Sequence, residues 1–237
     1  PTKAPSKDNP PVPFHKYTQR QAIEEGFILD VLQNYTNYET AFKLGSKINL
    51  DDKRVDKKYA RRSIAQWENL HPTNVTQKVQ FIMEHFRNNV QYLLDGEAKA
   101  MVVTSRRPVA VKYKLAFDKY IKKHNLQGIK SLVAFSGKVP GKDCGKDGEG
   151  EEHIGIDYEK EYTEYNLNPE AGNQDLRHVF DEEEYKVMIV AKKFQTGFNQ
   201  PKLVALYLDK KISDVDAVQT LSRLNRTYPG KDTTYVI

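Results

Sequence analysis

Short apolar runs separated by segments with helical spacing make up most of the chain after residue 96. The runs are too apolar to alternate between a buried and an exposed face, which is typical of strands buried on both faces of a sheet. Residues 109–123, between the first two runs, have the length of a crossover helix. The sequence therefore predicts an α/β fold with a parallel sheet covered by helices. The predicted strands lie at 101–103, 132–135, 187–191, 203–208 and 235–237.

Residues before 96 show helical periodicity instead. A first helix is predicted over 19–33, where Phe27 belongs to the apolar stripe, and a second is expected near Tyr59. A third starts near Asn74, which is placed to form a capping box with Gln77. The apolar residues of this third helix recur in steps of three and four and should face the core: Val79, Ile82, Met83, Phe86, Val90 and Leu93.

These patterns divide the chain into regions. Prolines are frequent in the first 13 residues, so we expect residues 1–18 to be a linker cut from a longer protein. Residues 19–98 should form a helical connector and the first covering helices, and 99–237 the sheet domain. An acidic, glycine-rich stretch at about 137–185 shows neither the periodicity of a helix nor that of a strand. It is predicted to be a long, partly disordered insertion.

The formal net charge of +5 is unevenly distributed. Residues 141–185 hold 15 acidic and 4 basic side chains, which leaves 33 basic against 17 acidic elsewhere. Such a basic excess attracts polyanions, so nucleic acid is the leading class of partner, although a merely basic soluble protein stays an alternative. One hypothesis is that the acidic stretch shields the basic surface when DNA is absent.

Other site classes find little support in the sequence. The single cysteine, Cys144, cannot form an internal disulfide or a thiolate-rich zinc site, and with His153 it would supply only two ligands, so we expect no metal site. No apolar run approaches the roughly 18 residues of a membrane span, and no signal-peptide pattern is present. We expect a soluble, cytoplasmic protein with no membrane partner.

Polar and basic residues follow four of the predicted strands, and ligands of open parallel sheets bind at the carboxyl ends of strands. Hydroxyls, exposed amides and cations are suited to phosphate groups. Each cluster alone could equally be a solvated loop, but four at one edge favour a nucleotide or nucleic-acid site. The clusters are Thr104-Ser105-Arg106-Arg107, Ser136-Gly137-Lys138, residues 192–201 and Asp209-Lys210-Lys211.

The last predicted helix begins at Asp214, a good N-cap residue. Arg223 and Arg226 are three residues apart, so on a helix they would be neighbours able to converge on one anion. Arginines that are solvated or that bridge to the fold stay an alternative. The side expected to face the core carries Ala217, Val218, Leu221 and Leu224.

Two of these stretches resemble a known family. Residues 193–201 (KFQTGFNQP) followed by 219–226 (QTLSRLNR) resemble motifs V and VI of superfamily 2 helicases, in the form typical of the restriction (R) subunit of type I restriction enzymes. Residues 100–106 are similar to its motif IV, and 20–32 to the segment joining its two motor lobes. The resemblance implies a second RecA-like helicase domain.

The resemblance also implies roles for individual residues. A nucleotide would lie between two lobes, with Arg223 and Arg226 stabilising charge on the transferred phosphoryl group. ATP and Mg²⁺ would be held mainly by a first RecA-like domain missing here, and this fragment alone would bind neither. Implied partners are double-stranded DNA, that first domain, and the modification and specificity subunits. Gly197, Asn199 and Gln219 would contact the nucleotide side, and Thr104, Ser105, Arg106, Ser136 and Thr196 the DNA.

Departures from the family pattern matter as well. Asn199 stands where the family usually has aspartate, so its role at the nucleotide is in doubt. No phosphate-binding G-x-x-x-x-G-K-[ST] loop is present, and residues 141–147, the nearest match, have the wrong spacing. The acidic run 181–184 does not fit the acidic box of helicases, because that box follows its strand and this run precedes one. The isolated fragment should be inactive, whereas its parent would be an ATP-dependent DNA translocase and site-specific deoxyribonuclease. Alternatives are another superfamily 2 lobe, from a repair or RNA helicase, or a non-catalytic basic nucleic-acid-binding scaffold.

Overall fold

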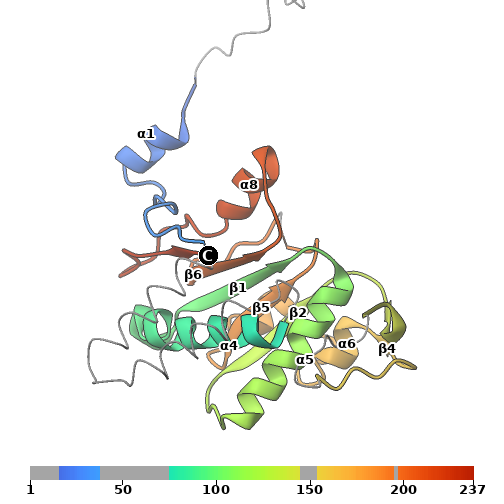
Figure 1. The fold of residues 1–237 in the computed structure, drawn as a ribbon. Helices are drawn as coiled ribbons and strands as arrows, with labels where there is room; N and C mark the ends of the chain where they lie inside the picture. Colours follow the sequence, from blue (N-terminus) through green and yellow to red (C-terminus); the bar gives the residue numbers. More distant parts are fainter. Residues whose placement is uncertain (1–15, 38–74, 145–153, 195–196) are drawn as a thin grey trace, which may run out of the picture.

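The computed structural model describes residues 16–37, 75–144, 154–194 and 197–237. A five-stranded sheet with the order β2-β5-β1-β6-β7 forms its centre (Figure 1). All neighbouring strands are parallel, and every residue of β1 and β5 is buried. The five predicted strands and the parallel sheet are therefore confirmed. Their bounds are Lys99–Thr104 (β1), Lys130–Ala134 (β2), Tyr185–Val190 (β5), Leu203–Asp209 (β6) and Tyr235–Val236 (β7).

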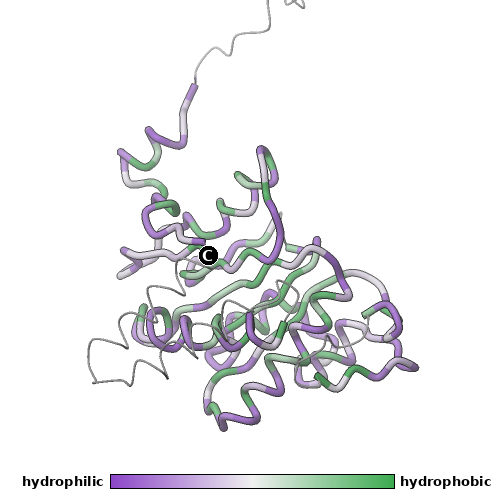
Figure 2. Tube along the Cα trace, in the orientation of Figure 1, coloured by the Kyte–Doolittle hydropathy of each residue, from purple (hydrophilic) through white to green (hydrophobic). Residues whose placement is uncertain are grey.

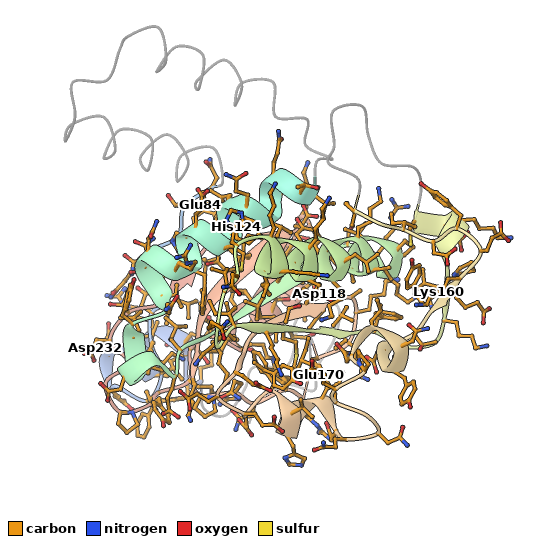
Figure 3. All side chains as sticks on the ribbon, turned by 90° about the horizontal axis from the view of Figure 1, so that it is seen from below. Glu84, Asp118, His124, Lys160, Glu170 and Asp232 are labelled. Carbon is orange, nitrogen blue, oxygen red and sulfur yellow. The ribbon has the colours of Figure 1, made fainter. Side chains whose placement is uncertain are left out.

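Helices α4 (Val75–His85) and α5 (Arg107–Lys123) cover one face of the sheet and lie side by side (Figure 3). A π-turn, η1 (Phe86–Val90), continues α4, and the 3₁₀ turn η2 (Leu93–Gly96) leads into β1. The apolar stripe of α4 and η1 is buried as predicted, with Leu93 packed at its margin. Alternate residues of the strands, such as Ala100 and Val102, join this core. The hydropathy colouring shows the same apolar runs along the central strands (Figure 2).

The opposite face carries a second apolar cluster, to which Met101 and Val103 of β1 belong. It includes Phe180 after α7 (Leu176–Val179), Phe198, and Leu224 beyond α8 (Asp214–Leu221). Strand side chains alternate between the two faces, so the apolar residues 100–103 of β1 pack on one side or the other in turn. This explains the absence of alternation in the sequence.

The predicted first helix is shorter than expected. Helix α1 spans Gln19–Glu24, and the chain then turns at Gly26, whose φ of 74° is a left-handed conformation that glycine adopts without strain. Phe27, predicted to lie on the apolar stripe, is 68 % exposed. The helix expected near Tyr59 and the capping role of Asn74 fall outside the described residues.

The connector returns to the sheet after α1. Tyr35 forms a parallel bridge with Val236, and the Thr36 amide donates to the Val236 carbonyl at 2.9 Å. The Asn34 side-chain amide donates to the Thr234 carbonyl at 3.1 Å. Residues 34–36 thus continue the sheet beyond β7, a pairing that helical periodicity did not predict.

The described part of the acidic insertion folds onto the sheet and contains short elements that the sequence pattern did not predict. It contains β3 (Val139–Pro140), η3 (Gly141–Cys144), β4 (Glu161–Tyr162), α6 (Glu164–Leu167) and α7. Its apolar residues are too sparse to show a period, but they are distributed over both cores. Ile154, Ile156, Tyr162 and Leu167 pack on the α5 side, and Ala171, Leu176, Val179 and Phe180 on the other.

Asn168 of the insertion covers the outer edge of β2. Its side-chain oxygen accepts from the Val133 amide at 3.0 Å, and its side-chain nitrogen donates to the Val133 carbonyl at 2.8 Å. Because β2 is an edge strand, these backbone groups would otherwise lack a partner. The insertion therefore protects the edge of the sheet.

Candidate functional site

The parallel strands bring the four predicted clusters to one edge of the sheet, since their carboxyl ends all point the same way. Ser105, Arg106 and Ser136 are exposed there. Arg107, at the start of α5, donates from Nη1 to the Ser136 carbonyl at 2.9 Å and so joins the loops after β1 and β2. This edge presents two hydroxyls and two arginines from neighbouring loops.

Thr104 differs from the other residues of its cluster. It is fully buried, and its hydroxyl donates to the Val190 carbonyl at 3.0 Å, across from β1 to β5. A hydroxyl has one proton to donate, and phosphate oxygens only accept, so this geometry gives Thr104 a role in closing the strand ends. A DNA contact by its side chain is not supported by this structure. Thr196 lies outside the described residues.

Carboxylates already neutralise several cations of these clusters. Lys193 pairs with Glu164 at 2.7 Å, and Lys138 with Glu161 at 2.8 Å. In the cluster after β6, Lys210 pairs with Asp216. Both glutamates belong to the acidic insertion, which therefore lies against the basic edge as well as against β2.

Helix α8 begins at Asp214 as predicted, although Ser213 is the N-cap residue, and it ends at Leu221, before either arginine. The Arg223 and Leu224 amides donate to carbonyls three residues back, which tightens the chain into a turn and buries Leu224. The prediction that both arginines lie on one helix is wrong. We call residues 222–226 the arginine turn.

Of the side of α8 expected to face the core, only part is covered. Leu221 packs against the second cluster, whereas Val218 is 50 % exposed. Val215, one turn earlier, is 67 % exposed. Gln219 is also exposed, and its backbone carbonyl accepts from Arg223 Nε at 3.2 Å.

Arg223 connects the arginine turn to the segment after β5. Its Nη1 donates to the Phe198 carbonyl at 2.8 Å, across 25 positions of sequence. Burial lowers the pKa of Arg223, and the positive charge of Arg226 lowers it further. The two positive charges therefore repel each other, and a turn rather than a helix carries both arginines.

Segment 197–201 contains the carbonyl that accepts this hydrogen bond, and it is held in place through Phe198 and Gln200. Phe198 is buried, while Gly197, with a φ of 70°, and Asn199 are exposed on either side of it. Gln200 is 3 % exposed and donates to Asp181 at 2.6 Å. Gly197 and Asn199 are thus presented next to a fixed backbone.

One residue of this region was missed by the sequence analysis. Lys231 is 3 % exposed, and its ammonium group donates to the carbonyls of Pro201, Leu224 and Arg226. A lysine within Pro-Gly-Lys-Asp has the sequence context of a solvated turn, so no local signal indicates burial. Only the fold shows that segment 197–201 and the arginine turn share this side chain.

Comparison with known proteins gives the family of the sheet-forming part of the chain. The family model of type I restriction enzyme subunit R domain 3 matches residues 96–237. This range contains all five strands of the central sheet and the residues predicted to contact the nucleotide and the DNA. The chain belongs to this family. The subunit R domain accounts for the sheet-forming part of the chain, and the alternative of a lobe from an unrelated repair or RNA helicase is set aside.

Relatives of the subunit R domain extend over more of the chain. A putative type I restriction enzyme endonuclease subunit of Methanocaldococcus jannaschii, MjaVIIP, is 27 % identical over 205 residues, covering 80 % of this chain and 17 % of that protein. A second from the same organism, MjaVIIIP, is 24 % identical, covering 91 % of this chain and 21 % of that protein. The chain thus spans about a fifth of the length of these curated relatives.

Among solved structures, the ATP-dependent type ISP restriction-modification enzyme LlaBIII bound to DNA is similar over 92 % of this chain and 12 % of its own, with 17 % identity and a TM-score of 0.46. The Pyrococcus furiosus Hef helicase domain matches 84 % of this chain at 18 % identity, with a TM-score of 0.37.

Among the described residues, no helix is both long and apolar enough to cross a membrane.

Proposed function

We propose that this domain forms one side of an ATPase cleft in the DNA-translocating subunit of a type I restriction enzyme. The observation that carries the proposal is the Arg223–Phe198 hydrogen bond. It joins the two stretches that resemble motifs V and VI, so the residues expected to act together on a nucleotide share one anchored surface. In this role Arg223 and Arg226 stabilise negative charge that develops on a phosphoryl group.

The charges of the arginine turn fit a polyanionic ligand. Among the described residues, neither Arg223 nor Arg226 forms an ion pair with a carboxylate. Burial and, after it, the charge of Arg226 lower the pKa of Arg223, and the negative charge of a triphosphate would offset both effects. Gly197 and Asn199 are placed beside this position to contact the nucleotide, and Gln219 flanks it.

The remaining parts of the cleft are assigned to the parent protein. The chain has no phosphate-binding loop, so ATP and Mg²⁺ are held mainly by a first RecA-like domain, and this domain supplies positive charge opposite them. DNA lies along the carboxyl edge of the sheet, where Ser105, Arg106 and Ser136 are exposed and contact its backbone. The modification and specificity subunits complete the assembly, which cleaves DNA.

The test is DNA-stimulated ATPase activity of the parent subunit in its complex, with Arg223→Ala and Arg226→Ala. An arginine finger contributes about 10³- to 10⁵-fold to the turnover of phosphoryl-transfer enzymes, so each variant should lose at least about 10²-fold in kcat. The KM for ATP should change less, because the interaction strengthens in the transition state.

Arg177→Ala is the matched control, since Arg177 lies on α7 and pairs with Asp175 outside the arginine turn. It should keep normal turnover. Near-normal turnover of both Arg223→Ala and Arg226→Ala would exclude the arginine-finger assignment and favour a non-catalytic nucleic-acid-binding scaffold.

A further inference from the structure

The ammonium group of Lys231 uses all of its hydrogen-bonding capacity on backbone carbonyls. The distances from Nζ are 3.0 Å to Pro201, 2.9 Å to Leu224 and 2.8 Å to Arg226. A lysine ammonium has three protons and accepts no hydrogen bond, so each proton has one acceptor. Burying such a group is costly unless all its donors are satisfied, as they are here.

The three carbonyls are spread over both stretches of the proposed cleft. Pro201 ends segment 197–201, Leu224 directly follows Arg223, and the third carbonyl is that of Arg226 itself. The Asn225 carbonyl, between the last two, accepts from the Leu29 amide of the connector at 2.9 Å. Every carbonyl from 224 to 226 is therefore held by a donor from elsewhere in the chain.

Arg223 and Arg226 are held in different ways. The Arg223 guanidinium is fixed directly through the carbonyls of Phe198 and Gln219. Arg226 is exposed, and within the described residues its side chain forms no hydrogen bond or ion pair. Its placement depends on its backbone, whose carbonyl is bound by Lys231.

We propose that Lys231 is a positioning residue, which sets the backbone of Arg226 against segment 197–201 and so directs the Arg226 guanidinium to the phosphoryl group. This inference rests on the proposed function and extends it to a residue outside the two motif-like stretches. Lys231 touches no substrate in this role; its effect on turnover passes through Arg226.

The experiment measures kcat and the KM for ATP of the parent subunit in its DNA-bound complex, with Lys231→Met. A displacement of about 1 Å in a catalytic group can reduce turnover about 10²-fold, so we expect a loss of kcat of that order with less than about threefold change in KM. In an Arg226→Ala background the same substitution should reduce kcat by less than about threefold, because Arg226 is already absent.

Lys114→Met is the matched control for lost stability. Lys114 of α5 is also buried, and its ammonium makes three hydrogen bonds, to Asp118, the Ser131 carbonyl and the Ser131 hydroxyl, away from the arginine turn. The thermal midpoints of both variants are measured beside kcat. At a similar loss of thermal stability, Lys114→Met should keep kcat within about threefold of the parent.

Equal losses of kcat in the two lysine variants, or equal effects of Lys231→Met with and without Arg226, would overturn the positioning role. If Lys231→Met does not fold, Lys231→Arg replaces it in the same measurements, with and without Arg226. An arginine keeps the charge and the donors, but its larger head group should displace the arginine turn. The proposed function fails separately, when Arg226→Ala alone leaves turnover unchanged.

Discussion

Several buried polar side chains of this domain hold backbone groups in place. Thr104 closes the ends of β1 and β5, Asn168 satisfies the edge of β2, and Lys231 fixes the arginine turn. A net hydrogen bond contributes only about 1 kcal/mol, but leaving a buried carbonyl or amide unsatisfied costs about 1–3 kcal/mol. Residue type alone does not show which polar residues have such partners.

His85 is a partly buried titratable residue of the α4 side, and it predicts a pH dependence of stability. Its Nδ1 lies 2.8 Å from the Tyr207 hydroxyl, and its ring contacts Phe81, Tyr207 and Tyr235. Burial lowers the pKa of His85 to about 4, against 6.5 for an exposed histidine. The unfolded chain therefore binds a proton between these values that the folded chain does not.

The free energy of unfolding should consequently fall as the pH decreases from about 6.5 towards 4, with His85 contributing about 3 kcal/mol of the loss. Urea unfolding across this range, with His85→Phe as comparison, measures the contribution. The variant should show a flatter dependence on pH. Parallel curves for the two proteins would show that His85 does not titrate in this way.

At the scale of elements, the acidic insertion has two structural functions. It covers the β2 edge through Asn168, and it places Glu161 and Glu164 against Lys138 and Lys193 at the carboxyl edge. A phosphate backbone that reaches these lysines competes with the two carboxylates. If the carboxyl edge binds DNA, as proposed, the insertion would reduce the positive charge offered to it, in keeping with the hypothesis drawn from the uneven charge distribution.

Replacing both carboxylates by amides, Glu161→Gln with Glu164→Gln, should tighten nonspecific binding of duplex DNA. Two freed lysines add up to two phosphate contacts, so the slope of log K against log salt should steepen by about 1 to 2. Fluorescence anisotropy at several salt concentrations measures it. The control is Glu170→Gln, whose partner Lys130 begins β2 at the opposite edge; an equal gain in that variant would contradict the shielding role.

At the scale of the whole molecule, the proposed function assigns to this fold one surface of a cleft rather than an enclosed nucleotide site. Segment 197–201 and the arginine turn are joined on one face, while the connector binds the same turn through Leu29 and the sheet edge through Thr36. The connector is therefore hydrogen-bonded both to the arginine turn and to the edge of the sheet. A second lobe attached through this connector would supply the opposite wall.

The chain by itself should therefore hydrolyse no ATP above background, with or without DNA. Its basic edge should still bind duplex DNA weakly, with a Kd of about 10 µM or weaker at physiological salt and a strong dependence on ionic strength. Phosphate release and anisotropy assays of the isolated chain test both statements. Robust hydrolysis by this chain alone would refute the half-cleft assignment.

The hydrophobic pattern by itself determined the strands, the helices α4 and α5, and the edge on which polar loops gather. This is possible because strands buried on both faces and helices with one apolar face are local consequences of burial. The resemblance of 193–201 and 219–226 to helicase motifs was also a prediction from local sequence. The family match later confirmed the resemblance to subunit R.

Tertiary structure alone decided which polar side chains form hydrogen bonds with distant backbone groups, where α8 ends, and how the insertion folds. Leu224 is drawn into the core beyond the helix, so Arg223 and Arg226 lie on a turn. The bonds of Lys231 and Asn168 join segments many residues apart, and a lysine or an asparagine has the same local context whether such a carbonyl is near or not. Long-range contacts of this kind leave no periodic signal, because they depend on how the whole chain packs.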